Sequence, residues 1–267
     1  LIKCNMKITL FTANNQRHNY FINLLSSISD ELFVIQECST TFQGIVPGHY
    51  PATQIMKEYF EYVSKAQQNI FGNAYIEVKS KLSLKPILLG DLNRLDINTI
   101  SEFLKSDLYI IFGSSYIKGD LVEFLSKKKA INIHMGISPF YRGCDCNFWA
   151  LYDGNPHLAG ATIHMLSKGL DSGPILYHAL SNIKTDPYTY TMSCVKSAFH
   201  SIAERIKNKE IFNIKSEIQE KSKEIRYSKK EDFNERVASE FLNKNMNPDF
   251  NFTDLSIYKD AFILEEL

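Results

Sequence analysis

The 267-residue sequence predicts an α/β fold: a Rossmann-like, mostly parallel sheet with helices on both faces and a small C-terminal extension. Two observations lead to this prediction. Short apolar runs alternate with amphipathic stretches of helical spacing, which is the pattern of strands covered by helices on both sides. The apolar runs also end in polar or glycine-containing turns. Such turns mark the carboxyl edge of a parallel sheet, where α/β folds bind their ligands.

The first βαβ unit occupies residues 7–37. An apolar, β-rich run at 7–12 predicts a strand, the amphipathic stretch 20–28 predicts a helix, and 31–37 predicts a second strand. Residues 52–76 carry apolar side chains at helical spacing without a proline, so we expect one long or broken helix there.

The alternation continues to about residue 207. We expect strands at 87–89, 107–113, 130–134, 161–165 and 175–180, and helices at 98–104, 118–125 and 188–207. Asn98 is the expected N-cap of its helix, because asparagine side chains accept hydrogen bonds from the free N–H groups of a helix start.

Composition argues against several classes of protein. Lys+Arg and Asp+Glu both count 30, so the net charge is near zero, which disfavours nucleic-acid binding through a large positive field. No apolar run approaches the ~20 residues that cross a bilayer, and residues 1–7 lack the apolar core of a signal peptide. Five cysteines, an odd number in a long chain, predict reduced thiols and a cytoplasmic location. We therefore expect neither nucleic acid nor membrane as a partner.

Asn132 and His134 stand at the end of the strand predicted at 130–134. Side chains alternate along a strand with a period of two, so the carboxamide and the imidazole point to the same side, into the crevice at the carboxyl edge. Further along, Asp171 lies between the two glycines of segment 169–173. That composition is typical of a tight loop, which can bring a carboxylate to the histidine.

Three features together resemble the tetrahydrofolate-dependent formyltransferases, a family that includes glycinamide ribonucleotide, methionyl-tRNA and sugar-nucleotide enzymes. They are the Asn-x-His strand end, the loop at 138–143 with its Ser-Pro and Tyr-Arg-Gly, and the Gly-Leu-Asp-Ser-Gly segment at 169–173. The resemblance is strongest over residues 131–176. It implies 10-formyltetrahydrofolate as the formyl donor. It also implies a catalytic set of Asn132, His134 and Asp171.

These residue types suit transfer of a formyl group to an amine. The attack develops negative charge on the formyl oxygen, to which Asn132 can donate a hydrogen bond; loss of such a donor costs a factor of ~100–1000 in rate. His134, with an ordinary pKa of about 6.5, can take the amine proton or help pass it to the leaving nitrogen. Asp171 can orient the imidazole, stabilise its charged form and hold a water. No covalent enzyme intermediate is required.

The resemblance also suggests where the donor and the acceptor bind. The family holds the pterin of the donor between loops that follow central strands, and the matching residues here are Leu88, Leu89, Gly90, Phe112, Gly113, Ser114, Tyr116 and Ile117. The residues expected at the acceptor are Arg17, His18, Asp91, Asn93, Arg142, Asn147 and Trp149. Among these, Arg17 and His18 are expected to approach an acceptor phosphate.

The acceptor distinguishes the members of the family. Residues 13–18 lack the glycines of the phosphate loop that the glycinamide ribonucleotide enzyme carries after its first strand. The transfer-RNA enzyme adds a basic C-terminal barrel, whereas the C-terminal part of this chain is shorter and carries both signs of charge. The remaining resemblance is to bacterial enzymes that N-formylate nucleotide-linked amino sugars for surface polysaccharides such as lipopolysaccharide. We therefore expect a nucleotide-linked amino sugar as the acceptor.

A change in composition divides the chain. From about residue 208, Lys and Glu become dense and apolar residues are scattered. We expect a formyltransferase catalytic domain at 1–207. The C-terminal extension, 208–267, is expected to form the interface of a homodimer or part of the acceptor pocket. Its Phe233, Val237 and Phe241 recur at helical spacing, which predicts a packed helix.

Several alternatives remain open at this stage. Cys144 and Cys146 are separated by one residue, whereas zinc sites prefer two to four between paired cysteines, so no metal is expected. A thiol nucleophile formed by Cys144 and His134 is disfavoured because the family chemistry needs no acyl-enzyme. A formyltetrahydrofolate hydrolase or a transfer-RNA or ribonucleotide formyltransferase would share the catalytic set. In another class, a folate- or nucleotide-binding protein without activity would share the fold.

Overall fold

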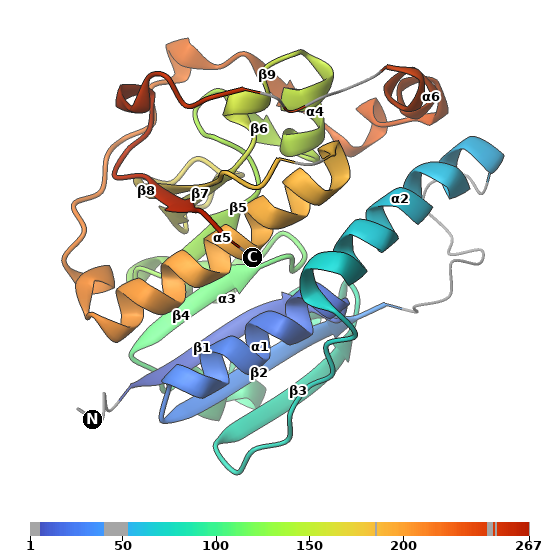
Figure 1. Ribbon diagram of the computed structural model, residues 1–267. Coiled ribbons are helices and arrows are strands. Elements are labelled where there is room, and N and C mark those ends of the chain that lie inside the picture. Colours follow the sequence, from blue (N-terminus) through green and yellow to red (C-terminus); the bar gives the residue numbers. More distant parts are fainter. Residues whose placement is uncertain (1–5, 40–52, 185, 245–247, 249, 267) are drawn as a thin grey trace.

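A computed structural model of the protein describes residues 6–39, 53–184, 186–244, 248 and 250–266. Within these residues, eight strands form one sheet in the order β10-β8-β7-β5-β4-β1-β2-β3 (Figure 1). Their bounds are β1 Lys7–Ala13, β2 Glu31–Cys38, β3 Leu82–Leu88, β4 Leu108–Phe112, β5 Ile131–His134, β7 Ala161–Met165, β8 Ile175–Ser181 and β10 Phe262–Leu264. The predicted α/β architecture with a mostly parallel sheet is confirmed.

Among the described strands of this sheet, β7 alone runs opposite to the others. Strands β3, β2, β1, β4 and β5 are parallel to one another. Strand β7 then runs antiparallel to β5, β8 runs antiparallel to β7, and β10 is parallel to β8. The carboxyl ends of β1, β4 and β5 therefore share one edge. The polar turns expected from the sequence lie along that edge.

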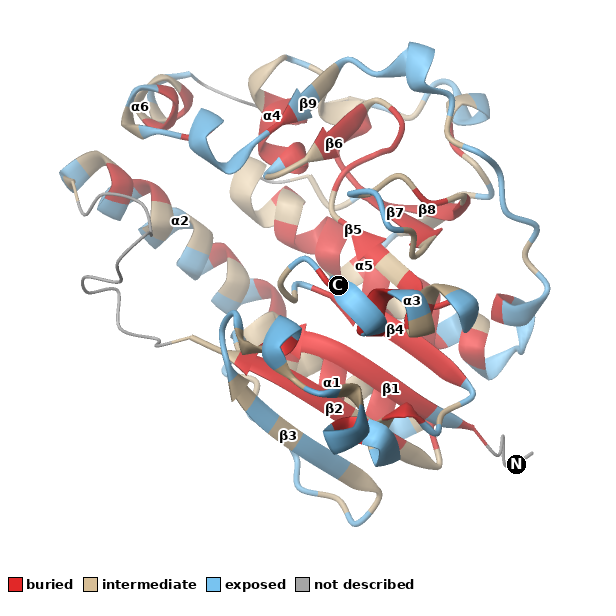
Figure 2. Cartoon of the chain, turned by 180° about the vertical axis from the view of Figure 1, so that it is seen from behind, coloured by how far each residue is buried: buried red, intermediate tan, exposed pale blue. Residues whose placement is uncertain are grey.

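Helices cover both faces of the sheet. Helices α1 (Gln16–Ile28) and α5 (Pro187–Lys207) lie on one face with α2 (Gln54–Phe71) beside them, and α3 (Gly119–Lys127) lies on the other (Figure 1). Figure 2 shows the result: β1 and β4 are buried along most of their length, whereas the edge strand β3 is largely exposed or half-buried.

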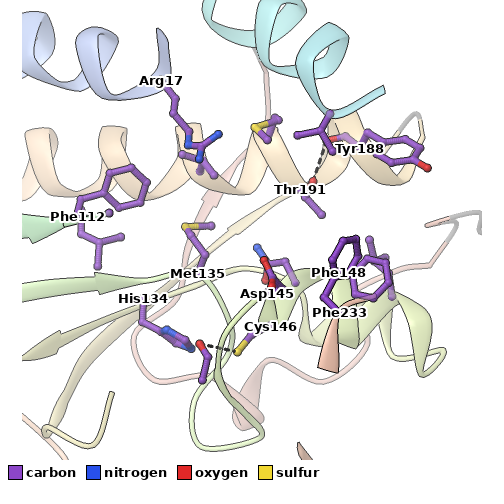
Figure 3. Close-up of a pocket in the computed structure, with 18 of the residues that line it drawn as sticks. Arg17, Phe112, His134, Met135, Asp145, Cys146, Phe148, Tyr188, Thr191 and Phe233 are labelled. Carbon is purple, nitrogen blue, oxygen red and sulfur yellow. Dashed lines mark hydrogen bonds between the residues drawn. The ribbon is translucent and has the colours of Figure 1, made fainter. Parts of the chain in front are cut away.

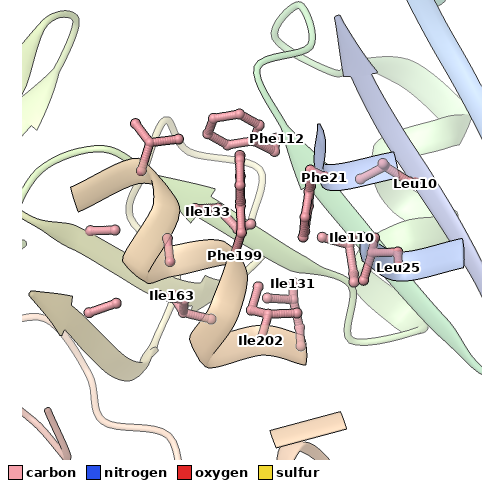
Figure 4. Packing of buried hydrophobic residues seen from close by; sticks show 14 of the residues in the cluster. Leu10, Phe21, Leu25, Ile110, Phe112, Ile131, Ile133, Ile163, Phe199 and Ile202 are labelled. Atoms are coloured by element: carbon pink, nitrogen blue, oxygen red, sulfur yellow. The ribbon is translucent and has the colours of Figure 1, made fainter. Parts of the chain in front are cut away.

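Stacked aromatic rings form the centre of the core between α1, α5 and the sheet. The ring of Phe199 from α5 stacks on Phe21 from α1, with centroids 4.2 Å apart and an interplanar angle of 9°. Phe112, at the end of β4, meets the edge of Phe199 at 4.9 Å (Figure 4). Such pairs stabilise by more than their buried area. This packing holds α5 against the strand that ends at the site.

Helix starts follow local chemistry, with one correction to the sequence prediction. The carboxylate of Asp186 accepts hydrogen bonds from the amides of Tyr188 and Thr189 and caps α5. The helix expected at 98–104 is a 3-10 helix, Ile97–Leu104, and its cap is Asp96 rather than Asn98. The reason is that the Asp96 carboxylate, in extended backbone, already accepts from the backbone N–H of Asn98 at 2.9 Å.

Shorter elements complete the chain. They are β6 Tyr141–Gly143, α4 Cys146–Tyr152, β9 Arg226–Ser228, α6 Glu235–Asn243 and the 3-10 helices Asp91–Arg94, Pro156–Leu158, Glu210–Phe212, Lys221–Lys223, Lys230–Asp232 and Leu255–Ile257. The edge strand β3 begins five residues before the run expected at 87–89. The sequence prediction missed this start because the exposed residues of the strand interrupt the apolar pattern. Residue 52 of the helix expected at 52–76 lies outside the described residues.

The described residues of the C-terminal extension share the core of the first 207 residues. Strand β10 extends the main sheet beside β8, and β9 pairs in parallel with β6. Helix α6 buries Val237, Ala238 and Phe241 against the cluster that holds Tyr59 and Phe148. The described residues from 208 onward thus pack as part of the same body. In the described stretches, no helix is both long and apolar enough to cross a membrane.

Candidate active site

A cavity of about 500 Å³ opens at the carboxyl edge of the sheet (Figure 3). One side is formed by α2 and α5, and the other by the end of β5, by α4 and by side chains of the C-terminal extension. The residues that line it from the central strands are Phe112, Gly113 and Ser114 after β4 and Asn132, Ile133, His134 and Met135 at β5. The cavity therefore lies where the strand ends predict a ligand.

The structure brings the predicted catalytic residues together at this cavity. His134 and Asn132 come from β5, and Asp171 reaches them from the loop between β7 and β8. The Nδ1 atom of the His134 imidazole lies 3.3 Å from Oδ2 of the Asp171 carboxylate; His134 is buried and Asp171 is only slightly exposed. Side-chain alternation along β5 and the glycine-flanked loop thus place Asn132, His134 and Asp171 in one cluster. The catalytic roles of its members remain a prediction.

Burial and charge set the protonation of this cluster. Burial lowers the pKa of His134 below its ordinary value, although the Asp171 carboxylate opposes the shift. Burial raises the pKa of Asp171, but the neighbouring His134, His164 and Arg142 outweigh it, so this pKa lies below its ordinary value. At neutral pH the pair is a neutral imidazole beside a carboxylate, which is the state of a general base.

His164 is a member of the cluster to which the sequence prediction assigned no role. Its Nδ1 lies 2.9 Å from the Met165 carbonyl oxygen, so Nδ1 carries the proton and Nε2 accepts. The Asn132 amide nitrogen donates to that Nε2 at 3.0 Å and to Oδ1 of Asp171 at 3.4 Å. In the sheet, Asn132 stands directly opposite His164 across the antiparallel pair β5–β7. The sequence prediction did not include His164 because a single sequence does not show which residues face each other across paired strands.

The residues expected at the donor fall into two groups. Phe112, Gly113 and Ser114 line the cavity beside Asn132. Ile117 is buried in the cluster under α3, and the half-exposed Tyr116 donates its hydroxyl hydrogen bond to the carbonyl of Lys168.

Three further expected donor residues lie outside the cavity, at the end of the edge strand β3. Leu88 and Leu89 are 71% and 49% exposed. The amide of Gly90 donates to the Glu37 carboxylate at 3.0 Å, and the other oxygen of Glu37 accepts from the amide of Ser115. Glu37 thus links the two expected donor loops, although only the loop after β4 reaches the cavity. The order of strands explains this: β3 follows β2 at the edge and is not next to β4.

Arg17 and His18, which we expected at the acceptor, line the cavity at the start of α1. Arg17 donates to Gln67 at 2.7 Å, and over the described ranges no carboxylate forms an ion pair with it. Burial lowers its pKa to about 10, so it remains a cation. Burial and the charge of Arg17 hold the pKa of His18 well below its ordinary value, so His18 is neutral. Among the described residues, this end of the cavity therefore offers a positive charge that no carboxylate neutralises.

The other expected acceptor residues are distributed differently. Asn147 lines the cavity and accepts from the amide of Gly160 at 2.9 Å. Asp91 and Asn93 lie beyond the cavity, where Asp91 pairs with Arg94 and Asn93 bridges the backbone of Tyr116 and Lys118. Trp149 is buried, with the Arg226 guanidinium 4.3 Å above its ring.

Arg142 is not among the residues that line the cavity. Its guanidinium pairs with Glu224 at 3.0 Å and donates to the carbonyl of Leu170 at 3.1 Å. The side chain thus contacts the loop that carries Asp171, and its geometry is that of a structural cation.

The sequence prediction missed the aromatic wall at the far end of the cavity. We use this name for Tyr59 and Phe60 from α2, Phe148 from α4, Tyr188 from α5, and Phe233 and Phe241 from the C-terminal extension. Phe148 and Phe233 pack edge to face with centroids 4.9 Å apart (Figure 3). The helical spacing of Phe233 and Phe241 predicted packing but not a surface that faces a ligand.

The cysteines near the site are poor nucleophiles. Burial raises the pKa of Cys144, and burial together with the Asp171 charge raises that of Cys146 well above its ordinary value. Both thiols therefore stay protonated at neutral pH. In the part of the chain that the structure describes, no three His, Cys, Asp or Glu side chains are grouped to hold a metal ion.

Comparisons with known proteins show the family of the chain and the fold that it shares. Residues 99–242 match the formyl transferase family. A methionyl-tRNA formyltransferase from Thermosynechococcus vestitus is 30% identical over 90 residues, which cover 34% of this chain and 27% of that protein. The chain therefore spans only about a quarter of the length of this curated relative.

Solved structures share the fold at low identity. A sugar N-formyltransferase from Shewanella sp FDAARGOS_354 superposes with a TM-score of 0.54 at 16% identity, covering 85% of this chain and 78% of that one. Glycinamide ribonucleotide transformylase 1 from Symbiobacterium toebii gives 0.51 at 13% identity, covering 81% and 95%. The acceptors in the names of these three proteins differ, so the fold alone does not select one.

Proposed function

This chain belongs to the formyl transferase family, and on that premise we propose that it moves the formyl group of 10-formyltetrahydrofolate to the amine of a nucleotide-linked amino sugar. The observation that carries the proposal is the arrangement of one cavity. A neutral histidine, a carboxamide and a carboxylate meet at its floor, and an unpaired arginine lines it at the start of α1.

His134 acts as the general base in this proposal. An amine that attacks a formyl carbon must lose a proton, and a neutral imidazole with a lowered pKa is in the form that accepts it. Asp171, 3.3 Å from Nδ1, holds the ring and stabilises its charged form once the proton arrives. The same imidazole can then return the proton to the leaving nitrogen, so no net charge is left at the site.

Asn132 supplies the hydrogen bond to the formyl oxygen. Its amide nitrogen carries two hydrogens, which contact His164 at 3.0 Å and Asp171 at 3.4 Å. The longer contact is the weaker one, because hydrogen bonds weaken with distance. An oxygen that develops negative charge would replace it, while His164 keeps the amide oriented. No reorganisation of the backbone is needed for this step.

The residues next to Asn132 fit a bound folate. 10-Formyltetrahydrofolate supplies the formyl carbon and a nitrogen leaving group. Phe112, Gly113 and Ser114 border the cavity beside Asn132 and offer an aromatic face, backbone polar groups and a hydroxyl. Gly113 has a φ of 68° and stands so close to His18 that a Cβ would lie 2.5 Å from its Nε2. A glycine is therefore required for this loop to keep its path along the cavity.

Charge and shape favour an anionic acceptor with an aromatic part. The guanidinium of Arg17 carries a positive charge at the cavity, and the oxygens of a phosphate match its planar set of hydrogen-bond donors. The aromatic wall offers a surface on which a nucleotide base can stack. The near-zero net charge disfavours a large nucleic acid, but the name of a curated relative makes methionyl-tRNA the second candidate acceptor. We place the enzyme in the cytoplasm. We further propose that it is a homodimer, and analytical ultracentrifugation of the purified protein would test that oligomeric state.

One experiment separates the candidate functions. The purified chain is incubated with 10-formyltetrahydrofolate and, in parallel, with nucleotide-linked amino sugars, glycinamide ribonucleotide, methionyl-tRNA or no acceptor. We expect mass spectrometry to find an amino sugar heavier by one CO. Formate release without acceptor would indicate a hydrolase, and formylation of methionyl-tRNA alone would select the second candidate. Binding without turnover on any acceptor would contradict both enzymatic proposals.

A further inference from the structure

We propose that Gln219, in the C-terminal extension, positions the catalytic Asp171 by clamping the backbone of its loop. The Asp171 loop is defined here as residues 168–173. This inference rests on the proposed function, since it concerns how Asp171 is placed against His134 and Asn132. It gives the extension a role beyond an interface or a pocket wall: it completes the catalytic geometry.

The Asp171 loop has little internal support. Asp171 adopts the left-handed backbone region with a φ of 46°, which costs a non-glycine residue conformational energy. Within residues 167–173, Ser167 forms side-chain hydrogen bonds with the carbonyl of Gly169 and the hydroxyl of Ser172. Gly173 presses on β7 so closely that a Cβ would lie 1.7 Å from the carbonyl oxygen of Met165. The loop must therefore be held from outside to keep the carboxylate in place.

Gln219 provides that hold. Its Nε2 donates to the carbonyl oxygen of Asp171 at 2.7 Å and to that of Gly173 at 2.8 Å. The side-chain amide of Gln219 thus donates both of its hydrogens to carbonyls of the same loop, one to that of Asp171 and one to that of Gly173. The opposite orientation of the amide would place its oxygen against two carbonyl oxygens, so only the donor side fits.

The backbone around Gln219 is itself anchored. Two residues earlier, Glu217 exchanges both backbone hydrogen bonds with Ile175 at the start of β8, at 2.7 and 2.8 Å. Five residues later, Glu224 pairs with Arg142, whose guanidinium also donates to the carbonyl of Leu170 in the same loop. Gln219 therefore holds the carbonyls of Asp171 and Gly173, and Arg142, which pairs with Glu224, holds the carbonyl of Leu170.

Small movements of this loop matter because the contacts of the carboxylate are long. Asp171 lies 3.3 Å from Nδ1 of His134 and 3.4 Å from the amide nitrogen of Asn132. Hydrogen bonds at such distances are close to the limit at which they still orient a partner. Release of the loop would separate the carboxylate from both groups, and turnover depends steeply on such placement. Gln219 is thus a positioning residue that acts through Asp171.

The test compares two substitutions of the same side chain. Gln219→Met keeps its length and removes the donor, whereas Gln219→Lys restores a donor to the carbonyls. We expect Gln219→Met to lower kcat about 10- to 100-fold, with an acceptor KM close to that of the wild type, because the anion site at Arg17 is untouched. Gln219→Lys should recover most of the loss. Asn213→Ala, which removes an exposed amide of the same extension, is the matched control and should behave as the wild type.

A second readout does not depend on turnover. Burial lowers the pKa of His134, the Asp171 carboxylate raises it, and His164 and Arg142 lower it further. Loosening Asp171 should therefore move the His134 titration, followed by NMR on the free protein, to lower pH in Gln219→Met. If a wild-type chain formylates nothing, the proposed function fails while this shift still tests the clamp. Unchanged kcat and an unchanged titration in a folded Gln219→Met protein would overturn the inference, as would a loss of kcat that Gln219→Lys fails to reverse.

Discussion

Among single residues, His134 carries the proton transfer in the proposed reaction. His134→Asn keeps a polar side chain of similar size but removes the base. We expect kcat/KM to fall about 1000-fold, since general base catalysis contributes a factor of ~100 to 10,000. Melting followed by circular dichroism should show a folded protein. His157→Asn, outside the cavity, is the control. Turnover of His134→Asn within a few-fold of the wild type would remove His134 from the catalytic set.

Arg17 tests the other end of the same cavity. Arg17→Met removes the charge that we expect to bind an acceptor phosphate. A hydrogen bond to a charged group contributes about 1.5–3 kcal/mol, so the acceptor KM should rise by about 10-fold or more while kcat changes little. Steady-state kinetics at two salt concentrations measures the effect. Arg236→Met, which removes an exposed guanidinium on α6, is the matched control. Equal KM values in Arg17→Met and the wild type would mean that Arg17 does not contact the acceptor.

The two site residues that strand alternation predicted are close to one another along the chain, whereas the residues that the sequence missed reach the site only through tertiary packing. Asn132 and His134 share a side of one strand, so their alternation was visible in three consecutive letters. His164 and Gln219 contact the same cluster through a strand register and a loop contact, which tertiary packing alone determines. Leu88, expected at the donor, lies at an exposed edge because nothing in the local pattern gives the order of the strands.

At the scale of elements, the packing of α5 holds the end of β4 at the cavity. Phe199 is fully buried between Phe21 and Phe112. Phe199→Ala should lower the free energy of unfolding by about 3–5 kcal/mol, because a large ring is replaced by a cavity. Phe212→Ala, at an aromatic residue that is 53% exposed, should change it by less than about 0.5 kcal/mol. Urea unfolding of both variants measures the difference. A cost below about 1 kcal/mol for Phe199→Ala would contradict this packing.

His178 joins two other elements and makes their contact sensitive to pH. The ring donates from Nε2 to the carbonyl of Ser138 at 3.0 Å and accepts at Nδ1 from the amide of Lys259, just before β10, at 2.9 Å. Both bonds are satisfied only by the neutral tautomer. Burial lowers the pKa of His178 to about 4. Since the unfolded value is about 6.5, the unfolded chain takes up a proton first as the pH falls.

The sign of this linkage gives a prediction. The stabilisation is fully present above about pH 6.5 and is lost as the pH falls towards the folded pKa, by roughly 3 kcal/mol in all. His178→Gln retains one donor and one acceptor but does not titrate. Urea unfolding at pH 7 and pH 4.5 should therefore show a smaller acid loss in His178→Gln than in the wild type. Equal losses in the two proteins would show that His178 is not a source of the pH dependence.

At the scale of the whole molecule, the extension and the first 207 residues are interdependent. The sequence suggested a boundary there because the composition changes, yet composition reports solvent exposure rather than independent folding. The described extension contains β10 of the main sheet, β9 paired with β6, the two phenylalanines of the aromatic wall, and Gln219 against the Asp171 loop. Its buried apolar residues, such as Phe233, Phe241 and Tyr258, are widely spaced along the chain. Apolar residues spaced in this way do not indicate a core in the sequence, although in the structure they are part of one.

This interdependence predicts the behaviour of a fragment that ends at residue 207. Removal of the extension would expose the buried surfaces of Phe148 and Tyr59 and leave β8 as an unpaired edge. A fragment 1–207 should therefore lose cooperative thermal unfolding and bind a hydrophobic dye, because exposed apolar surface and lost packing are the marks of a loosened state. Full-length protein treated with protease should likewise resist cleavage in the described stretch 217–228, since its backbone is paired there. A fragment 1–207 that melts cooperatively near the temperature of the intact chain would show that the catalytic body folds alone, and that the extension acts only through the site.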